Sequence, residues 1–130
     1  MSKFIKYLGI DWGEKRIGLA LGDSETRIAT PLGSVSSIED ILEIVKQEEI
    51  DELVIGLPLS LSGEIYRFPA NFKNFLNNLK KHGLILHLTD ERFSSREADV
   101  RIGKKLKKFN RDAVAAMIIL QSYLDKIYAD

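Results

Sequence analysis

The chain has 130 residues, of which 45% are hydrophobic and 29% charged, the ordinary balance of a soluble globular protein. It has no cysteine, which excludes a disulfide framework and a thiolate metal site. No apolar run approaches the ~18 residues of a membrane span, and Asp11 interrupts the short apolar stretch near the N-terminus. We therefore expect one cytoplasmic domain over residues 1–130, with no membrane segment.

Charge is distributed unevenly, although the net charge is zero. Residues 23–64 contain ten acidic and two basic residues, whereas residues 65–130 contain thirteen basic and seven acidic ones. The densest basic run, RIGKKLKKFNR at 101–111, has six cations and no carboxylate. A zero net charge disfavours an undirected polyanion binder, but this asymmetry is typical of a face built for an anionic partner. A solvated helix face followed by a loop is the alternative interpretation.

The first part of the chain reads as three strands, a helix and a fourth strand. Strands are expected over 3–10, 16–22 and 27–35, and a hairpin through WGEK joins the first two. Ser36-x-x-Glu39 is a capping box, and the apolar residues that follow at helical spacing indicate an amphipathic helix. Residues 52–57 (ELVIGL) form a short apolar run typical of a strand buried on both faces.

The second part of the chain alternates helices and strands. A helix over 70–81 ends at Gly83, a strand follows over 84–88, and Ser94-x-x-Glu97 is a second capping box that opens a helix toward Lys104. A long helix is expected over 112–128. The order β-β-β-α-β-α-β-α-α predicts an α/β fold with a mixed five-stranded sheet and helices on both faces. A ribonuclease H-like architecture has this order, and the pattern alone leaves other three-layer folds open.

Four acidic residues stand where a metal site could form. Asp11 ends an apolar strand, where a charge is costly unless it is used or paired. Asp90 and Glu91 follow a strand, at the edge where ligands usually bind in open α/β sheets. Asp112 opens the last helix, before a small-residue run (AVAA) that would allow close packing on the sheet. Converging carboxylates suit Mg²⁺ or Mn²⁺, and two-metal hydrolysis of phosphodiesters uses a pair ~3.5–4 Å apart.

Each acid also has a structural interpretation. Asp11 could accept backbone N–H bonds in the hairpin turn, and Asp90 or Glu91 could pair with Arg92. Asp112 could cap the last helix or stabilise its dipole, although Asn110 is a rival cap.

Glycines and aromatic residues allow two interpretations as well. Gly13, Gly18 and Gly22 fit no phosphate-binding fingerprint, so close packing within the hairpin is favoured over a phosphate cradle. Trp12 and Tyr66 could stack on bases or pack in the core or at its rim. His82 and His87 lack metal-ligand spacing and receive no role.

Four segments together resemble the YqgF family of RuvC-like proteins, described as pre-16S ribosomal RNA nucleases and as Holliday-junction resolvases. They are GIDWGEKRIGLALGD (9–23), VIGLPLSLSGE (54–64), TDERFSS (89–95) and RDAVAAMIILQSYLD (111–125). They occur in the family's order and span nearly the whole chain. Two departures are the segment IYRFPANF after the second motif and Arg111, where the family commonly has an apolar residue.

The resemblance implies a ribonuclease H-like fold and a divalent-metal-dependent nuclease that matures the 5′ end of 16S ribosomal RNA. Asp11, Glu91 and Asp112 correspond to the family's metal ligands, with Asp90 as a neighbour and substitute for Glu91. Lys15, Arg16, Arg92 and Arg96 would lie near the phosphate backbone, although Arg92 could instead hold the carboxylates. The basic run would add sequence-independent phosphate contacts through Arg101, Lys104, Lys105, Lys107, Lys108 and Arg111.

Three rival functions remain open at this point. A junction-resolving DNA endonuclease would act on branched DNA as a symmetric dimer, because two opposed cuts need two active sites. A non-catalytic RNA-binding or ribosome-assembly factor would bind RNA without regard to divalent metal. A nucleotide-binding relative of the sugar-kinase and actin-like fold is disfavoured by length, because such proteins pair two domains around the nucleotide. The sequence leaves open whether the protein is a monomer or a dimer.

Overall fold

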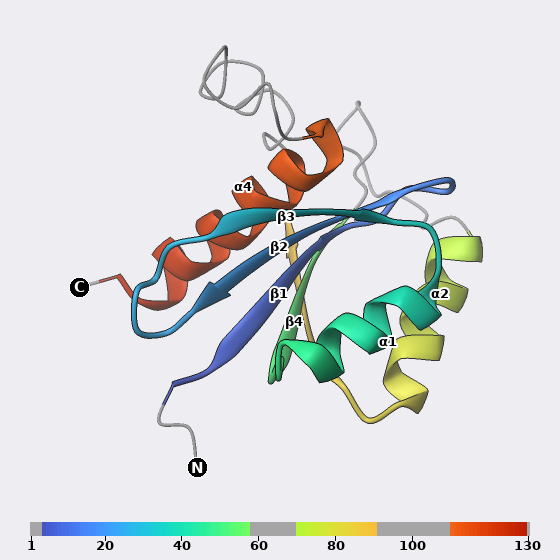
Figure 1. The fold of residues 1–130 in the computed structure, drawn as a ribbon, viewed down its shortest axis with the longest axis horizontal. Helices are drawn as coiled ribbons and strands as arrows, with labels where there is room; N and C mark the ends of the chain where they lie inside the picture. Colours follow the sequence, from blue (N-terminus) through green and yellow to red (C-terminus); the bar gives the residue numbers. More distant parts are fainter. Residues whose placement is uncertain (1–3, 58–69, 91–109, 130) are drawn as a thin grey trace.

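The computed structural model describes residues 4–57, 70–90 and 110–129. These residues form a five-stranded mixed sheet with α1 and α2 on one face and α4 on the other (Figure 1). The elements in chain order are β1 (Lys6–Asp11), β2 (Ile17–Asp23), β3 (Thr30–Val35), α1 (Ile38–Gln47), β4 (Glu52–Leu57), α2 (Ala70–Lys81), β5 (Ile85–Asp90) and α4 (Arg111–Ile127). The predicted architecture is confirmed over this part of the chain. The helix expected to open at Ser94 lies outside the described residues.

The strand order of the sheet is β3-β2-β1-β4-β5. β1 is antiparallel to β2 and parallel to β4, and β4 is parallel to β5. The three parallel strands therefore reach the same edge of the sheet with their carboxyl ends, which are Asp11, Leu57 and Asp90. This edge is where ligands bind in open α/β sheets.

Alternate residues of the central strands pack against different helices, because successive side chains of a strand point to opposite faces. Leu8 and Ile10 of β1 face the core under α1 and α2, which includes Ile41 and Phe72. Tyr7 of β1 belongs to the core under α4. Both faces of β1 and β4 are thus covered, which explains the continuous apolar runs that the sequence shows in these strands.

Several elements begin or end at residues other than those predicted. The third strand begins at Thr30, because Asp23 accepts hydrogen bonds from the backbone N–H groups of Glu25 and Thr26 and folds the preceding segment into a turn. The cap of α1 is Ser37 and not Ser36: its hydroxyl accepts from the backbone N–H of Asp40 at 3.2 Å. The fifth strand extends to Asp90, which therefore ends the strand and does not follow it.

Glycines of the sheet allow the backbone of α4 to approach it closely. A Cβ at Gly9 of β1 would lie 2.7 Å from the Cβ of Leu120 and 2.9 Å from the carbonyl oxygen of Ala116. Such distances are below ordinary van der Waals contact, so only glycine fits. The four residues of the AVAA run are buried, and Ala116 among them packs in the core between α4 and the sheet, as the sequence predicted for this run.

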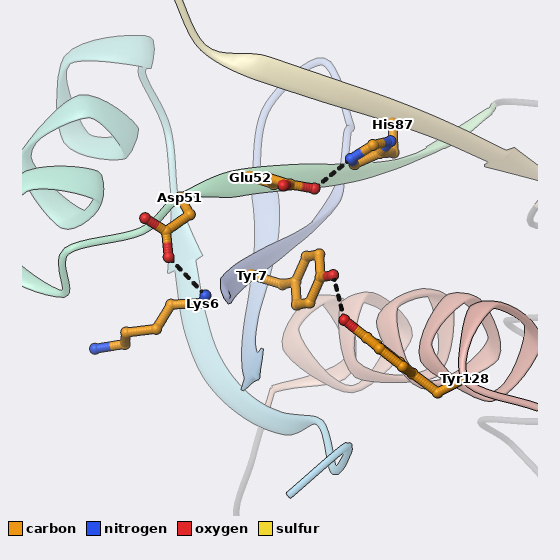
Figure 2. Close-up of polar contacts among 6 residues, drawn as sticks. All are labelled: Lys6, Tyr7, Asp51, Glu52, His87 and Tyr128. Carbon is orange, nitrogen blue, oxygen red and sulfur yellow. Dashed lines mark hydrogen bonds and ion pairs between the residues drawn. The ribbon is translucent and has the colours of Figure 1, made fainter. Parts of the chain in front are cut away.

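Polar contacts lie at the far end of α4, where β1 and β4 begin (Figure 2). The hydroxyls of Tyr7 and Tyr128 lie 2.8 Å apart, and His87 Nε2 lies 2.5 Å from Glu52 Oε1. The rings of His87 and Tyr123 stack with centroids 5.2 Å apart. His87 therefore has a structural role that its position in the sequence did not reveal.

Candidate active site

Asp11 is the last residue of β1 and is half-buried. In the antiparallel ladder its partner is Gly18 of β2, and cross-strand partners lie on the same face of a sheet. Gly9, two residues earlier, faces α4, and side-chain alternation places Asp11 on that face too. Asp11 therefore stands at the carboxyl end of β1, on the side of the sheet that α4 covers.

Gly18 brings the start of α4 to the same place. A Cβ at Gly18 would lie 1.9 Å from the carbonyl oxygen and 3.0 Å from the Cα of Asp112. The backbone of β2 is thus in direct contact with the first turn of α4. Because Gly18 is also the ladder partner of Asp11, the strand and the helix deliver Asp11 and Asp112 to one end of the sheet.

Asp112 does not cap its helix. The side chain of Asn110 accepts a hydrogen bond from the backbone N–H of Ala113 at 2.7 Å and so takes the capping role. The amide of Asn110 also donates to the hydroxyl of Ser34 in β3 at 3.2 Å, which ties the helix start to the neighbouring strand. The carboxylate of Asp112 is thereby left for other contacts, as the rival cap in the sequence suggested.

Asp112 is in contact with a cation. Its Oδ2 lies 3.1 Å from Nε of Arg16, which belongs to the hairpin between β1 and β2. The side chain of Asp112 is 28% exposed, so solvent and ions have access to it. Lys15, Arg16 and Arg111 are all exposed, and they belong to the same hairpin and to the first turn of α4. Asp112 thus lies beside basic residues that can contact phosphates.

The remaining predicted site residues are described in part or not at all. The backbone of Asp90 pairs with that of Leu57, which puts it at the same sheet edge as Asp11, two strands away. The others lie outside the described residues: Glu91, Arg92, Arg96, Arg101, Lys104, Lys105, Lys107 and Lys108.

Trp12 and the glycines have structural roles that the structure makes clear. The ring of Trp12 packs on Phe72 at 5.2 Å and on Phe75 at 6.4 Å, which favours core packing over base stacking. Close packing within the hairpin holds for Gly13, whose Cβ would lie 2.6 Å from the carbonyl oxygen of Arg16. Gly18 and Gly22 pack against α4 instead, Gly18 at Asp112 and Gly22 at Leu120 and Leu124.

A divalent cation fits the donors present. Carboxylate oxygens are the ligands that Mg²⁺ and Mn²⁺ prefer, and Asp11 and Asp112 reach one end of the sheet from two elements. Within residues 4–57, 70–90 and 110–129, no group of three or more acidic, histidine or cysteine side chains is placed to hold a metal ion. The described part of the chain thus provides two candidate ligands.

Solved structures share this fold. The structure of T. thermophilus RuvC in complex with Holliday junction substrate superposes with a TM-score of 0.58, covering 96% of each chain at 15% identity. That of Thermus thermophilus RuvC gives a TM-score of 0.55, covering 95% of this chain and 96% of RuvC at 14% identity. The sheet order and the helices on both faces thus define a ribonuclease H-like fold.

Sequence relatives identify the family. The family model described as "RuvX: Holliday junction resolvase" matches residues 5–126. Proteins of Sulfurihydrogenibium sp. (strain YO3AOP1) and Bordetella pertussis, both named "Putative pre-16S rRNA nuclease", are each 39% identical to the chain. The matches cover 94% and 92% of this chain and 91% and 93% of the relatives. The chain belongs to the RuvX family. This confirms the resemblance to RuvC-like nucleases that the four sequence segments indicated. The chain is therefore a nuclease, a hydrolase of phosphodiester bonds.

In the described part of the chain, none of the helices has the length and apolar character needed to cross a membrane.

Proposed function

We propose that this protein is a divalent-metal-dependent nuclease that matures the 5′ end of pre-16S ribosomal RNA, with Asp11 and Asp112 as metal ligands. The observation that carries the proposal is the contact of Gly18 with Asp112, because Gly18 is also the ladder partner of Asp11. Glu91, with Asp90 beside it, is our proposed third ligand. The names of the two relatives support the choice of RNA as substrate.

The acidic residues of the proposed site serve as metal ligands, and the basic residues contact phosphates. A bound Mg²⁺ or Mn²⁺ would supply an activated water and would stabilise the charge that develops on the phosphate. Asp11 and Asp112 would hold the ion, and their backbones are fixed by the ladder and by the contact with Gly18. The exposed Lys15, Arg16 and Arg111 bind neighbouring phosphates without reading sequence.

Cleavage of a labelled pre-16S RNA fragment in Mg²⁺, Mn²⁺ or EDTA tests this proposal. We expect cleavage in either metal, none in EDTA, and a loss of at least about 100-fold in Asp11→Asn and Asp112→Asn, because each variant removes a ligand charge. Asp125→Asn is the matched control, since Asp125 is an exposed acid at the other end of the same helix. Full activity in Asp11→Asn would refute the site, and binding without cutting would favour an assembly factor.

A second candidate function is resolution of branched DNA, which the description of the family favours. It requires a symmetric dimer with two active sites, because two opposed strands must be cut. A four-way DNA junction included in the same assay, with the molar mass measured by light scattering, separates the two functions. If a dimer cleaved the junction and the RNA stayed intact, branched DNA would take the place of RNA as the proposed substrate.

A further inference from the structure

The ion pair between Arg16 and Asp112 has no evident structural task. The side chain of Arg16 is 73% exposed, and exposed ion pairs contribute little to stability. The start of α4 is already fixed by other contacts, namely the backbone packing on Gly18 and the cap and strand contact of Asn110. The pair can therefore break at little cost to the fold.

The backbone of Arg16 is held in place, whereas its side chain is exposed to solvent. Its carbonyl oxygen is close to Gly13 across the hairpin, and the next residue, Ile17, is buried at the start of β2. The guanidinium, by contrast, lies at the end of a long side chain that is mostly in solvent. A guanidinium binds both carboxylate and phosphate oxygens through the same N–H donors. Arg16 can thus pass from one anion to another without a change in the backbone.

The partner of Arg16 is the carboxylate that we propose as a metal ligand. A guanidinium and a divalent ion compete for the same charge, so Asp112 cannot engage both fully. We propose that Arg16 is an exchange residue: it neutralises Asp112 when no metal is bound and is released to a phosphate of the nucleic acid when Asp112 takes a divalent ion. This inference rests on the proposed function, and it makes the binding of metal and of nucleic acid cooperative.

Cooperativity of this kind is reciprocal. If the metal releases Arg16 for a phosphate, then the nucleic acid, by holding Arg16, must raise the affinity for metal by the same factor. An arginine that contacted phosphate in all states would add to nucleic-acid affinity but would not couple it to the metal. The two roles therefore differ in how nucleic-acid binding responds to metal.

The first experiment measures Mn²⁺ binding by calorimetry without nucleic acid, in the wild type, Arg16→Gln and Asp112→Asn. Removal of the competing guanidinium is expected to tighten Mn²⁺ binding by up to about fivefold, the range of an exposed ion pair. Asp112→Asn is expected to weaken it strongly. Unchanged or weaker Mn²⁺ binding in Arg16→Gln would overturn the inference while leaving the nuclease site intact. Wild-type Mn²⁺ binding that Asp112→Asn does not weaken would refute the proposed function itself.

The second experiment measures the salt dependence of binding to a pre-16S RNA fragment by fluorescence anisotropy, with Mg²⁺ or EDTA, before cleavage accumulates. In Mg²⁺, Arg16→Gln is expected to lower the salt slope by about one phosphate contact, roughly 0.7 to 0.9. In EDTA the slope should stay near that of the wild type, because Arg16 is then held by Asp112.

Lys15→Gln is the matched control, because Lys15 is the neighbouring exposed cation and, within the described residues, it is Arg16 and not Lys15 that pairs with Asp112. Its effect on the salt slope is expected to be the same with and without metal. Arg16→Lys is expected to restore part of the Mg²⁺-dependent contact, since it keeps the charge and loses the fork of N–H donors. If Arg16→Gln changed the salt slope of RNA binding equally in Mg²⁺ and in EDTA, the proposed exchange of Arg16 between Asp112 and a phosphate would be overturned.

Discussion

Gly18 and Asp112 are in backbone contact, with the carbonyl oxygen of Asp112 at 1.9 Å from where a Cβ of Gly18 would stand. The contact joins the start of β2 to the first turn of α4, and it sets how far Asp112 lies from the neighbouring strand that carries Asp11. Because glycine has no side chain, Gly18 thus determines the geometry of the proposed site.

Gly18→Ala is expected to push the start of α4 away from the sheet. Overpacking of this kind costs about 1–3 kcal/mol in the free energy of unfolding, and we expect nuclease activity to fall by more than stability alone explains. Gly22→Ala is the control, because its nearest neighbours would be the flexible side chains of Leu120 and Leu124, at 3.0 and 3.2 Å. Urea denaturation and RNA cleavage check both variants. Wild-type activity in a folded Gly18→Ala protein would contradict this role.

Asn110→Ala removes the cap of α4 and its contact with Ser34. We expect a loss of about 1 kcal/mol in the free energy of unfolding and a fall in activity, because the first turn that carries Asp112 frays. Ser37→Ala removes the equivalent cap of α1, on the other face of the sheet, and should cost similar stability without affecting cleavage. Equal losses of activity in the two variants would show that capping acts only through overall stability.

Trp12→Ala distinguishes core packing from base stacking. Because the ring packs on Phe72 and Phe75, we expect the free energy of unfolding to fall by about 3 kcal/mol. The affinity for a single-stranded RNA, measured well below the melting temperature of the variant, should stay near the wild-type value. A loss of affinity of tenfold or more in a fully folded variant would assign Trp12 to the RNA surface.

Most elements could be placed from the sequence, since buried strands and amphipathic helices have their own periods. Asp11 and Asp112 stand at a strand end and a helix start, where topology brings them to one edge. The close approach of the Asp112 backbone to Gly18 could not be predicted, because it depends on packing between residues far apart in the chain. The pair Arg16–Asp112 escaped prediction for the same reason, and the choice of Ser37 over Ser36 depends on a one-residue shift in the start of α1.

The buried phenol of Tyr7 makes stability depend on pH at the alkaline end. Burial, together with the hydrogen bond to Tyr128, raises the pKa of Tyr7 well above the ordinary value of 10.0. The unfolded chain therefore loses this proton at a lower pH than the folded protein does. Tyr7 contributes its full stability below about pH 10, and the free energy of unfolding should fall as the pH rises beyond that value.

Tyr7→Phe tests this dependence, because it removes the ionisable group and keeps most of the packing. Denaturation in urea between pH 8 and 11 should show a shallower alkaline decline for this variant than for the wild type. Tyr128→Phe removes the partner hydroxyl and leaves Tyr7 buried, so most of the decline should remain, since burial is the largest cause of the raised pKa. A decline of wild-type steepness in Tyr7→Phe would assign the alkaline sensitivity to another group, such as Tyr123, whose pKa burial also raises.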